Sequence, residues 1–291
     1  REAESNFICK RCEESIVPQE DFMAKPNSDL SIGKTEEIPP DKTGPVNVIL
    51  GMVPPWQTKM PPLGLAYLSS FLRSHGIKTK IIDLNVKLFN NSTQEKRHFW
   101  EIATLNNFTP EQIGRDFCAA FNDQIEDFIA QAAESEAPII GLSTTIASLN
   151  VAISIAHKIK QKTPSKVVVL GWPGVFWNTK ILDPNRKIDV FVIGEGELPM
   201  LEIIKRFQKE PNIGNLAGIP GTIVQLNGKY HDCSTPDPLR NIDEVPLVDF
   251  LGFDLDEYDI IDGYRPLPIL ISRGCVNHCS FCIDHKMNAP F

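Results

Sequence analysis

The segment VNVILGMVP, residues 46–54, is apolar nearly throughout and rich in β-branched side chains. A run of this kind predicts a strand that is buried on both faces of a sheet. The next segment, PPLGLAYLSSFLRSHG at residues 61–76, has leucines at helical spacing and ends in Gly76, the residue type that favours a helix C-terminus. A doubly buried strand followed by an amphipathic helix is typical of an α/β sheet.

The alternation of strand and helix continues along the chain. Further strands are predicted at KTKIIDLN (residues 78–85), APIIGLSTTI (137–146), KVVVLGWP (166–173) and IDVFVIGEGE (188–197). Parallel strands need crossover connections, which are usually helices, so these five strands predict an α/β fold with a doubly wound parallel sheet over residues 46–215. Ligands of such sheets bind at the carboxyl ends of the strands.

Other segments flank the predicted sheet. Residues 1–45 are polar and predict an N-terminal extension, in which Cys9 and Cys12 have the spacing of half a zinc knuckle or are two free thiols. Residues 216–265 contain a hairpin signal at Asn227-Gly228 and then a connection rich in Pro, Asp and Gly. LPILISRG, residues 267–274, predicts one more buried strand.

Composition limits the class of protein. The 291 residues carry a formal net charge of −8, which argues against a nucleic-acid partner. The chain has no apolar stretch near the ~20 residues that cross a bilayer and no N-terminal apolar run like that of a signal peptide. Seven unevenly spaced cysteines are unlike a secreted disulfide framework. We therefore expect a cytoplasmic protein with no membrane association.

Cys275, Cys279 and Cys282 crowd into the last residues of the chain as C-x3-C-x2-C. Three thiolates on one short loop suit three corners of an iron–sulfur cluster and leave one iron without a protein ligand. Zinc sites usually close with four ligands from two separated pairs, but His278 or His285 could complete such a site, so zinc remains an alternative.

This motif, with Phe281 before the last cysteine and a predicted strand before the first, resembles the radical S-adenosylmethionine superfamily. The resemblance implies a [4Fe-4S] cluster on Cys275, Cys279 and Cys282, with S-adenosylmethionine chelated by the open iron. It also implies an electron donor such as flavodoxin or ferredoxin, adenine contact by Phe281, and Arg273 either pairing with a cofactor carboxylate or capping the strand end.

The predicted sheet is similar to the Rossmann-like, cobalamin-binding domain that precedes the partial TIM barrel in one class of these enzymes. Small residues admit a phosphate or ring closely and hydroxyls donate hydrogen bonds. Two departures stand out: the motif Asp-x-His-x-x-Gly is absent after the first strand, and Trp172 replaces a glycine. The resemblance assigns the nucleotide tail of cobalamin to Ser143, Thr144, Thr145, Gly171, Gly174, Gly194, Glu195 and Gly196.

Four acidic or amide residues have a simpler interpretation. Glu195 and Glu197 are expected as helix-start carboxylates rather than a catalytic pair. Asp83 and Asn85 follow a strand toward the possible cofactor site, or form a loop turn.

The sequence as a whole predicts a part of a cobalamin-dependent radical S-adenosylmethionine enzyme. Methyl transfer to carbon on a small-molecule or unknown substrate is the commonest theme of that class. Two alternatives stay open: a radical oxidoreductase whose Rossmann-like domain binds no cobalamin, and a non-catalytic cobalamin-binding module. Because the chain starts at Arg1 and residues 266–291 hold only the first strand and cluster loop of a barrel, we expect a truncated chain that does not turn over S-adenosylmethionine alone.

Overall fold

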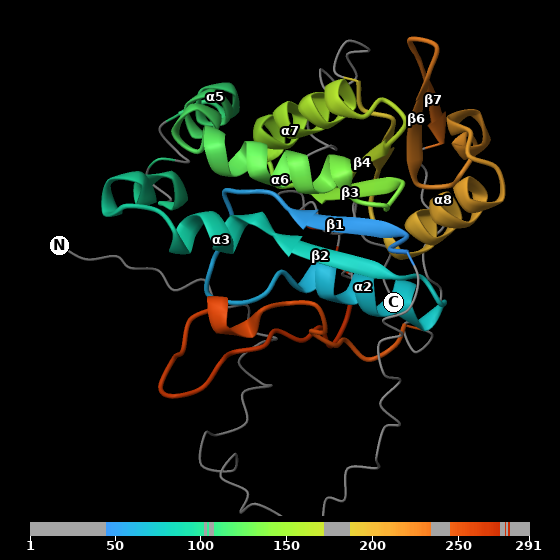
Figure 1. Ribbon diagram of the computed structural model, residues 1–291. Coiled ribbons are helices and arrows are strands. Elements are labelled where there is room, and N and C mark those ends of the chain that lie inside the picture. The colour runs from blue at the N-terminus through green and yellow to red at the C-terminus, as the bar shows by residue number, and fades with distance from the viewer. Residues whose placement is uncertain are drawn as a thin grey trace, which may run out of the picture. The chain divides into compact units, whose positions relative to one another are not determined.

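The computed structural model describes residues 45–101, 104, 108–171, 187–233, 245–273, 277 and 279 of the chain. They belong to one compact unit, Thr43–Phe291. Its centre is a seven-stranded sheet in the order β2-β1-β3-β4-β5-β6-β7 (Figure 1). The strands are β1 (Val48–Met52), β2 (Thr79–Asp83), β3 (Ile139–Ser143), β4 (Val167–Gly171), β5 (Val190–Val192), β6 (Thr222–Leu226) and β7 (Lys229–Cys233).

The first five strands pair in parallel, which confirms the predicted doubly wound sheet. The chain order reverses between β1 and β3, because β2 lies on one side of β1 and β3 on the other. Open α/β sheets bind ligands outside the carboxyl ends of their strands at such a switch point. The topology therefore directs the search for a site to the ends of β1 and β3.

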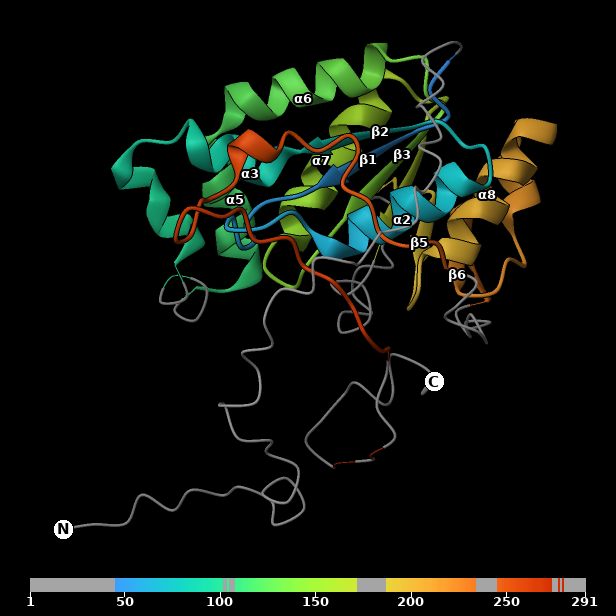
Figure 2. The ribbon, with the colours of Figure 1, turned by 90° about the horizontal axis from the view of Figure 1, so that it is seen from below.

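Helices cover both faces of the sheet (Figures 1 and 2). Alternate residues of a strand point to opposite faces, so Val48 packs with the core under α2 and α8 while Ile49 packs with the core under α5, α6 and α7. The helices are α2 (Leu63–Ser74), α3 (Leu84–Asn90), α5 (Pro110–Ala120), α6 (Asn122–Glu134), α7 (Leu149–Lys162) and α8 (Glu197–Lys209), with short 3-10 turns η2 (Gln94–Trp100), η5 (Ile213–Leu216) and η7 (Leu255–Glu257).

Two turn predictions are confirmed. Gly76 follows the end of α2 with φ +75°, a left-handed conformation that glycine adopts without a steric penalty. Asn227 and Gly228 have φ +50° and +75° and join β6 to β7 in a tight hairpin. The hairpin also extends the sheet, because β6 pairs antiparallel with β5, whereas the sequence placed it in the connection.

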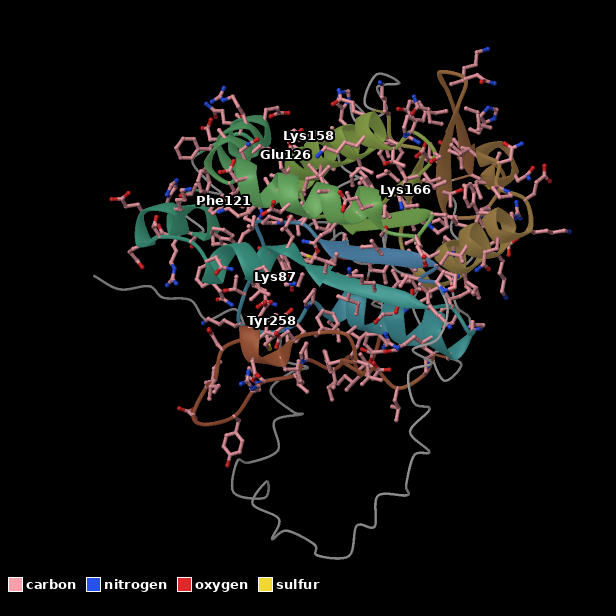
Figure 3. The ribbon with its side chains drawn as sticks, in the orientation of Figure 1. Lys87, Phe121, Glu126, Lys158, Lys166 and Tyr258 are labelled. Atoms are coloured by element: carbon pink, nitrogen blue, oxygen red, sulfur yellow. The ribbon has the colours of Figure 1, made fainter. Side chains whose placement is uncertain are left out.

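The segment after residue 245 lies along the side of the sheet that carries α2. Asp249 pairs with Arg73 of α2, and its backbone N–H donates to Ser70 Oγ at 3.0 Å. In Figure 3, Tyr258 lies below α3, the helix that carries Lys87. The hydroxyl of Tyr258 donates to Asp83 Oδ2 at 2.6 Å. These contacts fasten the segment to the ends of α2 and β2.

The predicted buried strand at 267–274 is wrong for the residues described. Residues 266–273 form no strand, and Ile269 and Ile271 are 70% and 91% exposed. Their apolar, β-branched pattern has no neighbouring strand to pair with among the described residues, and a strand exists only in a ladder of hydrogen bonds.

None of the helices in the described ranges combines the length and the apolar character that a bilayer crossing requires. Residues 1–44, with Cys9 and Cys12, and the predicted ligands Cys275 and Cys282 lie outside the described residues.

Candidate functional site

A cleft of about 560 Å³ opens at the carboxyl ends of β1, β3, β4 and β5, between α2 and α8. Its floor is apolar and is made by Leu50, Val169, Val192 and Met200. Ligand sites are typically concave, mostly apolar and supplied with a few polar groups. This cleft has that character and lies where the topology of the sheet predicts a ligand.

Glycines keep the wall of the cleft open. A Cβ added to Gly171, at the end of β4, would lie 3.7 Å from the carbonyl oxygen of Leu142, an ordinary contact. Gly194 has φ +78°, a conformation that L side chains rarely adopt. Gly196, directly before α8, would place a Cβ 3.9 Å from Leu68. Gly171 and Gly196 both line the cleft, so a longer side chain at either position would compete with a ligand for space.

Gly141 belongs to the same wall, although the sequence did not point to it. It lies inside β3, and a Cβ there would approach Leu50 Cδ2 at 3.1 Å and Met200 Cε at 3.5 Å. A glycine inside a strand often marks a close approach of another group. The position of Gly141 inside a predicted strand could therefore have identified it from the sequence.

The predicted hydroxyl groups after β3 separate into two kinds. Ser143 lines the cleft. Thr144 is buried and donates from Oγ1 to the carbonyl of Gly171 at 2.7 Å. Thr145 exchanges hydrogen bonds with Ser148, whose Oγ accepts from the Thr145 N–H at 2.8 Å. Thr144 therefore ties the ends of β3 and β4 together, and Thr145 shapes the turn before α7.

Asp83 does not line the cleft. Its Oδ1 accepts from the N–H of Val86 at 3.0 Å, which caps α3, and its Oδ2 accepts from the hydroxyl of Tyr258. Burial raises the pKa of Asp83 above its ordinary value, and the hydrogen bonds from Tyr258 and the backbone oppose that rise. The same burial, with the charge of Asp83, raises the pKa of Tyr258. This carboxyl is a structural group.

Asn85 holds the loop after β1. Its Oδ1 accepts from the N–H of Trp56 at 2.9 Å and from Nε1 of Trp100 at 2.7 Å, and its Nδ2 donates to the carbonyl of Gln57 at 3.1 Å. The expected loop turn is wrong, because Asp83 ends β2 and caps α3 while Asn85 lies within α3, and neither residue lines the cleft.

Arg273, which the resemblance placed on the S-adenosylmethionine side, pairs with Glu195 of the predicted cobalamin side and with Glu197, which was expected as a helix-start carboxylate. Its Nη2 donates to Glu197 Oε1 at 2.5 Å, and its Nη1 lies 3.5 Å from Glu195 Oε1. All three side chains line the cleft and are between 6% and 11% exposed. Burial acts to lower the pKa of Arg273, but the charges of Glu197 and Glu195 raise it.

The segment that carries Arg273 borders the mouth of the cleft. The Tyr67 hydroxyl donates to the carbonyl of Leu270 at 3.3 Å, and the Leu270 N–H donates to Tyr67 Oη at 3.4 Å. The Arg273 guanidinium lies 5.3 Å from the centre of the Tyr67 ring, within the range of a cation–π contact. Leu270, Ser272 and Arg273 therefore form one rim of the cleft.

Several predicted site residues cannot be placed. Gly174, Trp172, Phe281, Cys275 and Cys282 lie outside the described residues. Cys279 is described, exposed and free of any disulfide.

Comparison with known protein families matches residues 52–204 to the B12 binding domain. The chain belongs to the B12-binding domain family. The match runs from the last residue of β1 into α8, so it includes the ends of β3, β4 and β5 that form the cleft. Most residues that line the cleft therefore lie within the matched domain, whereas Leu50, Leu270, Ser272 and Arg273 lie outside it.

Curated relatives of this member of the B12-binding domain family include methyltransferases. It is 30% identical over 229 residues to an uncharacterized methyltransferase, PH0819, of Pyrococcus horikoshii, covering 77% of this chain and 41% of the relative. It is 20% identical over 250 residues to cytidylyl-2-hydroxyethylphosphonate methyltransferase of Streptomyces wedmorensis, covering 76% and 43%. The chain therefore spans about two fifths of the length of these relatives.

A third relative and a solved structure complete the comparison. Anaerobic magnesium-protoporphyrin IX monomethyl ester cyclase of Synechocystis is 25% identical over 147 residues, covering 50% of this chain and 28% of the relative. The radical S-adenosylmethionine methyltransferase TsrM of Kitasatospora setae, solved with cobalamin and a [4Fe-4S] cluster, aligns with a TM-score of 0.48 at 15% identity, covering 83% of this chain and 42% of TsrM.

The residues of the cleft fit a cofactor with a nucleotide tail. Gly171, Gly194 and Gly196 leave space along the wall, the floor is apolar, and Ser143 offers a hydroxyl. The loop after β1, residues 53–62, contains no histidine that could ligate cobalt from below. The cleft therefore suits a cobalamin held by its tail and without a histidine ligand from this loop.

Proposed function

We propose that this chain binds cobalamin, with the nucleotide tail in the cleft between α2 and α8. The observation that carries the proposal is the glycine-walled, apolar cleft of about 560 Å³ within the matched B12-binding domain. When bound, cobalamin supplies a cobalt centre that can carry a methyl group. The chain's own contribution is to hold the tail and to shield it from water.

Individual residues have distinct parts in this proposal. Ser143 lines the cleft and would donate a hydrogen bond to the tail, and Gly171, Gly194 and Gly196 would allow the backbone to approach it. Gly174 is proposed for the same wall from its place in the sequence. Thr144 and Thr145 act indirectly, because the hydroxyl of Thr144 ties the end of β3 to that of β4 and the hydroxyl of Thr145 holds the turn before α7.

We also propose that residues 266–291 begin a radical S-adenosylmethionine domain. Cys275, Cys279 and Cys282 would hold a [4Fe-4S] cluster, and Phe281 would contact the adenine of S-adenosylmethionine. A flavodoxin or ferredoxin would reduce the cluster. One electron from the reduced cluster would then cleave S-adenosylmethionine to methionine and a 5′-deoxyadenosyl radical. That radical would take a hydrogen atom from the substrate.

The activity proposed for the whole protein is methyl transfer to carbon. The support for it is that two relatives carry the name methyltransferase and cover 77% and 76% of this chain. Together with the C-x3-C-x2-C motif, these relatives favour an enzyme over a non-catalytic cobalamin carrier.

The test begins with anaerobic reconstitution of the protein with iron and sulfide. We expect about four iron and four sulfide per chain, and loss of both in a matched variant with Cys275, Cys279 and Cys282 changed to Ala. In the full-length protein, S-adenosylmethionine should then yield 5′-deoxyadenosine. A colourless protein with stoichiometric zinc would contradict the cluster, and a confirmed cluster without 5′-deoxyadenosine would contradict the radical chemistry.

A further inference from the structure

Two carboxylates lie in the wall of the cleft. Glu197 is the first residue of α8, Glu195 precedes it in the loop after β5, and both side chains are largely buried. Buried carboxylates are unfavourable unless a positive charge or hydrogen bonds compensate them. Arg273 provides that charge to both, at 2.5 Å from Glu197 and 3.5 Å from Glu195.

The compensating charge comes from a distant part of the chain. Arg273 is 76 residues away from Glu197 in sequence and lies two residues before Cys275. Within the part of the chain that the structure describes, residues 270–273 pack against Tyr67 and the two glutamates, and this packing places the guanidinium of Arg273 in the cleft. The charge of the cleft therefore depends on whether this segment is docked.

The proposed ligand is itself anionic where it enters the cleft, because the nucleotide tail of cobalamin contains a phosphodiester. With the segment undocked, Glu197 loses the guanidinium that lies 2.5 Å from its carboxylate, and the carboxylates of the wall then repel an anionic ligand more strongly. With the segment docked, Arg273 offsets one of these charges, and a guanidinium has five N–H donors, more than the two carboxylates occupy here.

We propose that Arg273 is the counter-ion that allows the cleft to accept an anionic nucleotide tail, so that cofactor binding and docking of residues 270–273 favour one another. This inference rests on the proposed binding of cobalamin. Such coupling is reciprocal: if docking raises the affinity for the ligand, the ligand stabilises docking by the same factor. Occupancy of the cleft would thereby fix the start of the cysteine loop, and Arg273 acts as a positioning residue.

The test measures the Kd of hydroxocobalamin by visible absorbance in four forms of the protein. The forms are the wild type, Arg273→Lys, Arg273→Gln, and the triple variant Arg273→Gln, Glu195→Gln, Glu197→Gln. We expect Arg273→Gln to weaken binding at least about tenfold, within the usual range of coupling between sites. Arg273→Lys should retain most of the affinity, and the triple variant should regain it, because the repelling charges are gone.

A second measurement needs no substitution. Amide hydrogen exchange of a peptide that covers residues 266–273 should slow when hydroxocobalamin is added to the wild type. The same addition should leave exchange unchanged in Arg273→Gln. Circular dichroism of each variant checks that it is folded.

The outcomes separate this inference from the function beneath it. If the wild type does not bind hydroxocobalamin, the proposed function is wrong. If the wild type binds it but exchange of residues 266–273 is unaltered, or the triple variant binds no better than Arg273→Gln, cobalamin binding stands and the role of Arg273 as counter-ion is overturned.

Discussion

Nη2 of Arg273 lies 2.5 Å from Oε1 of Glu197, which joins the segment leading into the cysteine motif to the first turn of α8. Negative charge at a helix N-terminus is favourable in its own right, so Glu197 is placed well even without a partner. The arginine adds a link between the wall of the cleft and residues that begin the proposed cluster loop. The pair of Glu197 and Arg273 thereby connects the cleft, where we propose that cobalamin binds, to the proposed cluster loop.

Filling the cleft should weaken ligand binding without unfolding the protein. In Gly171→Leu the Cβ has room, at 3.7 Å from the carbonyl of Leu142, and the longer side chain at this cleft-lining position should take space from the ligand. We expect hydroxocobalamin to bind at least about tenfold more weakly, equivalent to about 1.4 kcal/mol. Equilibrium titration measures this loss, with Gly171→Ala as the milder control. Unaltered affinity in a folded Gly171→Leu protein would place the ligand elsewhere.

The buried pair of Lys160 and Asp189 should be important for stability. Lys160 Nζ lies 2.9 Å from Asp189 Oδ2, both side chains are about 10% exposed, and the same carboxylate accepts from the Val168 N–H at 2.8 Å. Lys160→Met leaves a buried carboxylate without its counter-ion, so the free energy of unfolding should fall by about 3–5 kcal/mol. Urea denaturation measures it.

A more exposed ion pair provides the control for that prediction. Lys158 Nζ lies 2.7 Å from Glu126 Oε1, where α7 meets α6, and about a third of each side chain is exposed (Figure 3). Exposed pairs contribute about 0–1 kcal/mol, so Lys158→Met should have little effect. Equal losses in the two variants would show that burial of Asp189 is not what makes its pair important.

Asp83 should make stability depend on pH. Burial raises its pKa in the folded protein above the ordinary value of 3.8, so the folded state binds the proton more tightly than the unfolded state. The resulting stabilisation is complete below the unfolded pKa and is lost as the pH rises through the folded pKa. Asp83→Asn removes this dependence and keeps an acceptor for the N–H of Val86.

The measurement is urea denaturation of both proteins between about pH 4 and pH 7. The free energy of unfolding of the wild type should fall relative to that of Asp83→Asn as the pH rises. Parallel curves would mean that the pKa of Asp83 is the same in the folded and unfolded states.

Close packing of α5 on α7 predicts a steric effect at Gly114. A Cβ there would lie 2.5 Å from Cβ of Asn150, closer than two non-bonded carbon atoms can approach. Gly114→Ala should therefore destabilise the protein by about 1–3 kcal/mol, although alanine favours helix formation. Gly64 in α2 has no atom within 4 Å of an added Cβ, so Gly64→Ala should not lower the urea midpoint. Similar midpoints for the two variants would contradict the close approach.

Local patterns in the sequence predicted the sheet and its turns. The apolar run at β1, Gly76 after α2 and Asn227-Gly228 in the hairpin each follow from neighbouring residues alone. The position of the cleft followed as well, because parallel strands end at the same edge of a sheet.

Contacts between distant segments were not predictable from such patterns. Arg273 pairs with a glutamate 76 residues away, and Tyr258 donates to an aspartate 175 residues away. Ile269 and Ile271 are β-branched and apolar, as strand residues often are. Residues 266–273 nevertheless have no strand beside them among the residues described. In each case the outcome depends on which segments meet in space, which local propensity does not encode.

The most direct test of the account is a titration of the wild-type protein with hydroxocobalamin, followed by visible absorbance and by gel filtration. We expect a saturable spectral change at about one cobalamin per chain, with the cofactor retained by the protein, since small ligands bind in clefts of this kind. An unchanged spectrum and no retained cobalamin, in a protein shown to be folded, would contradict it.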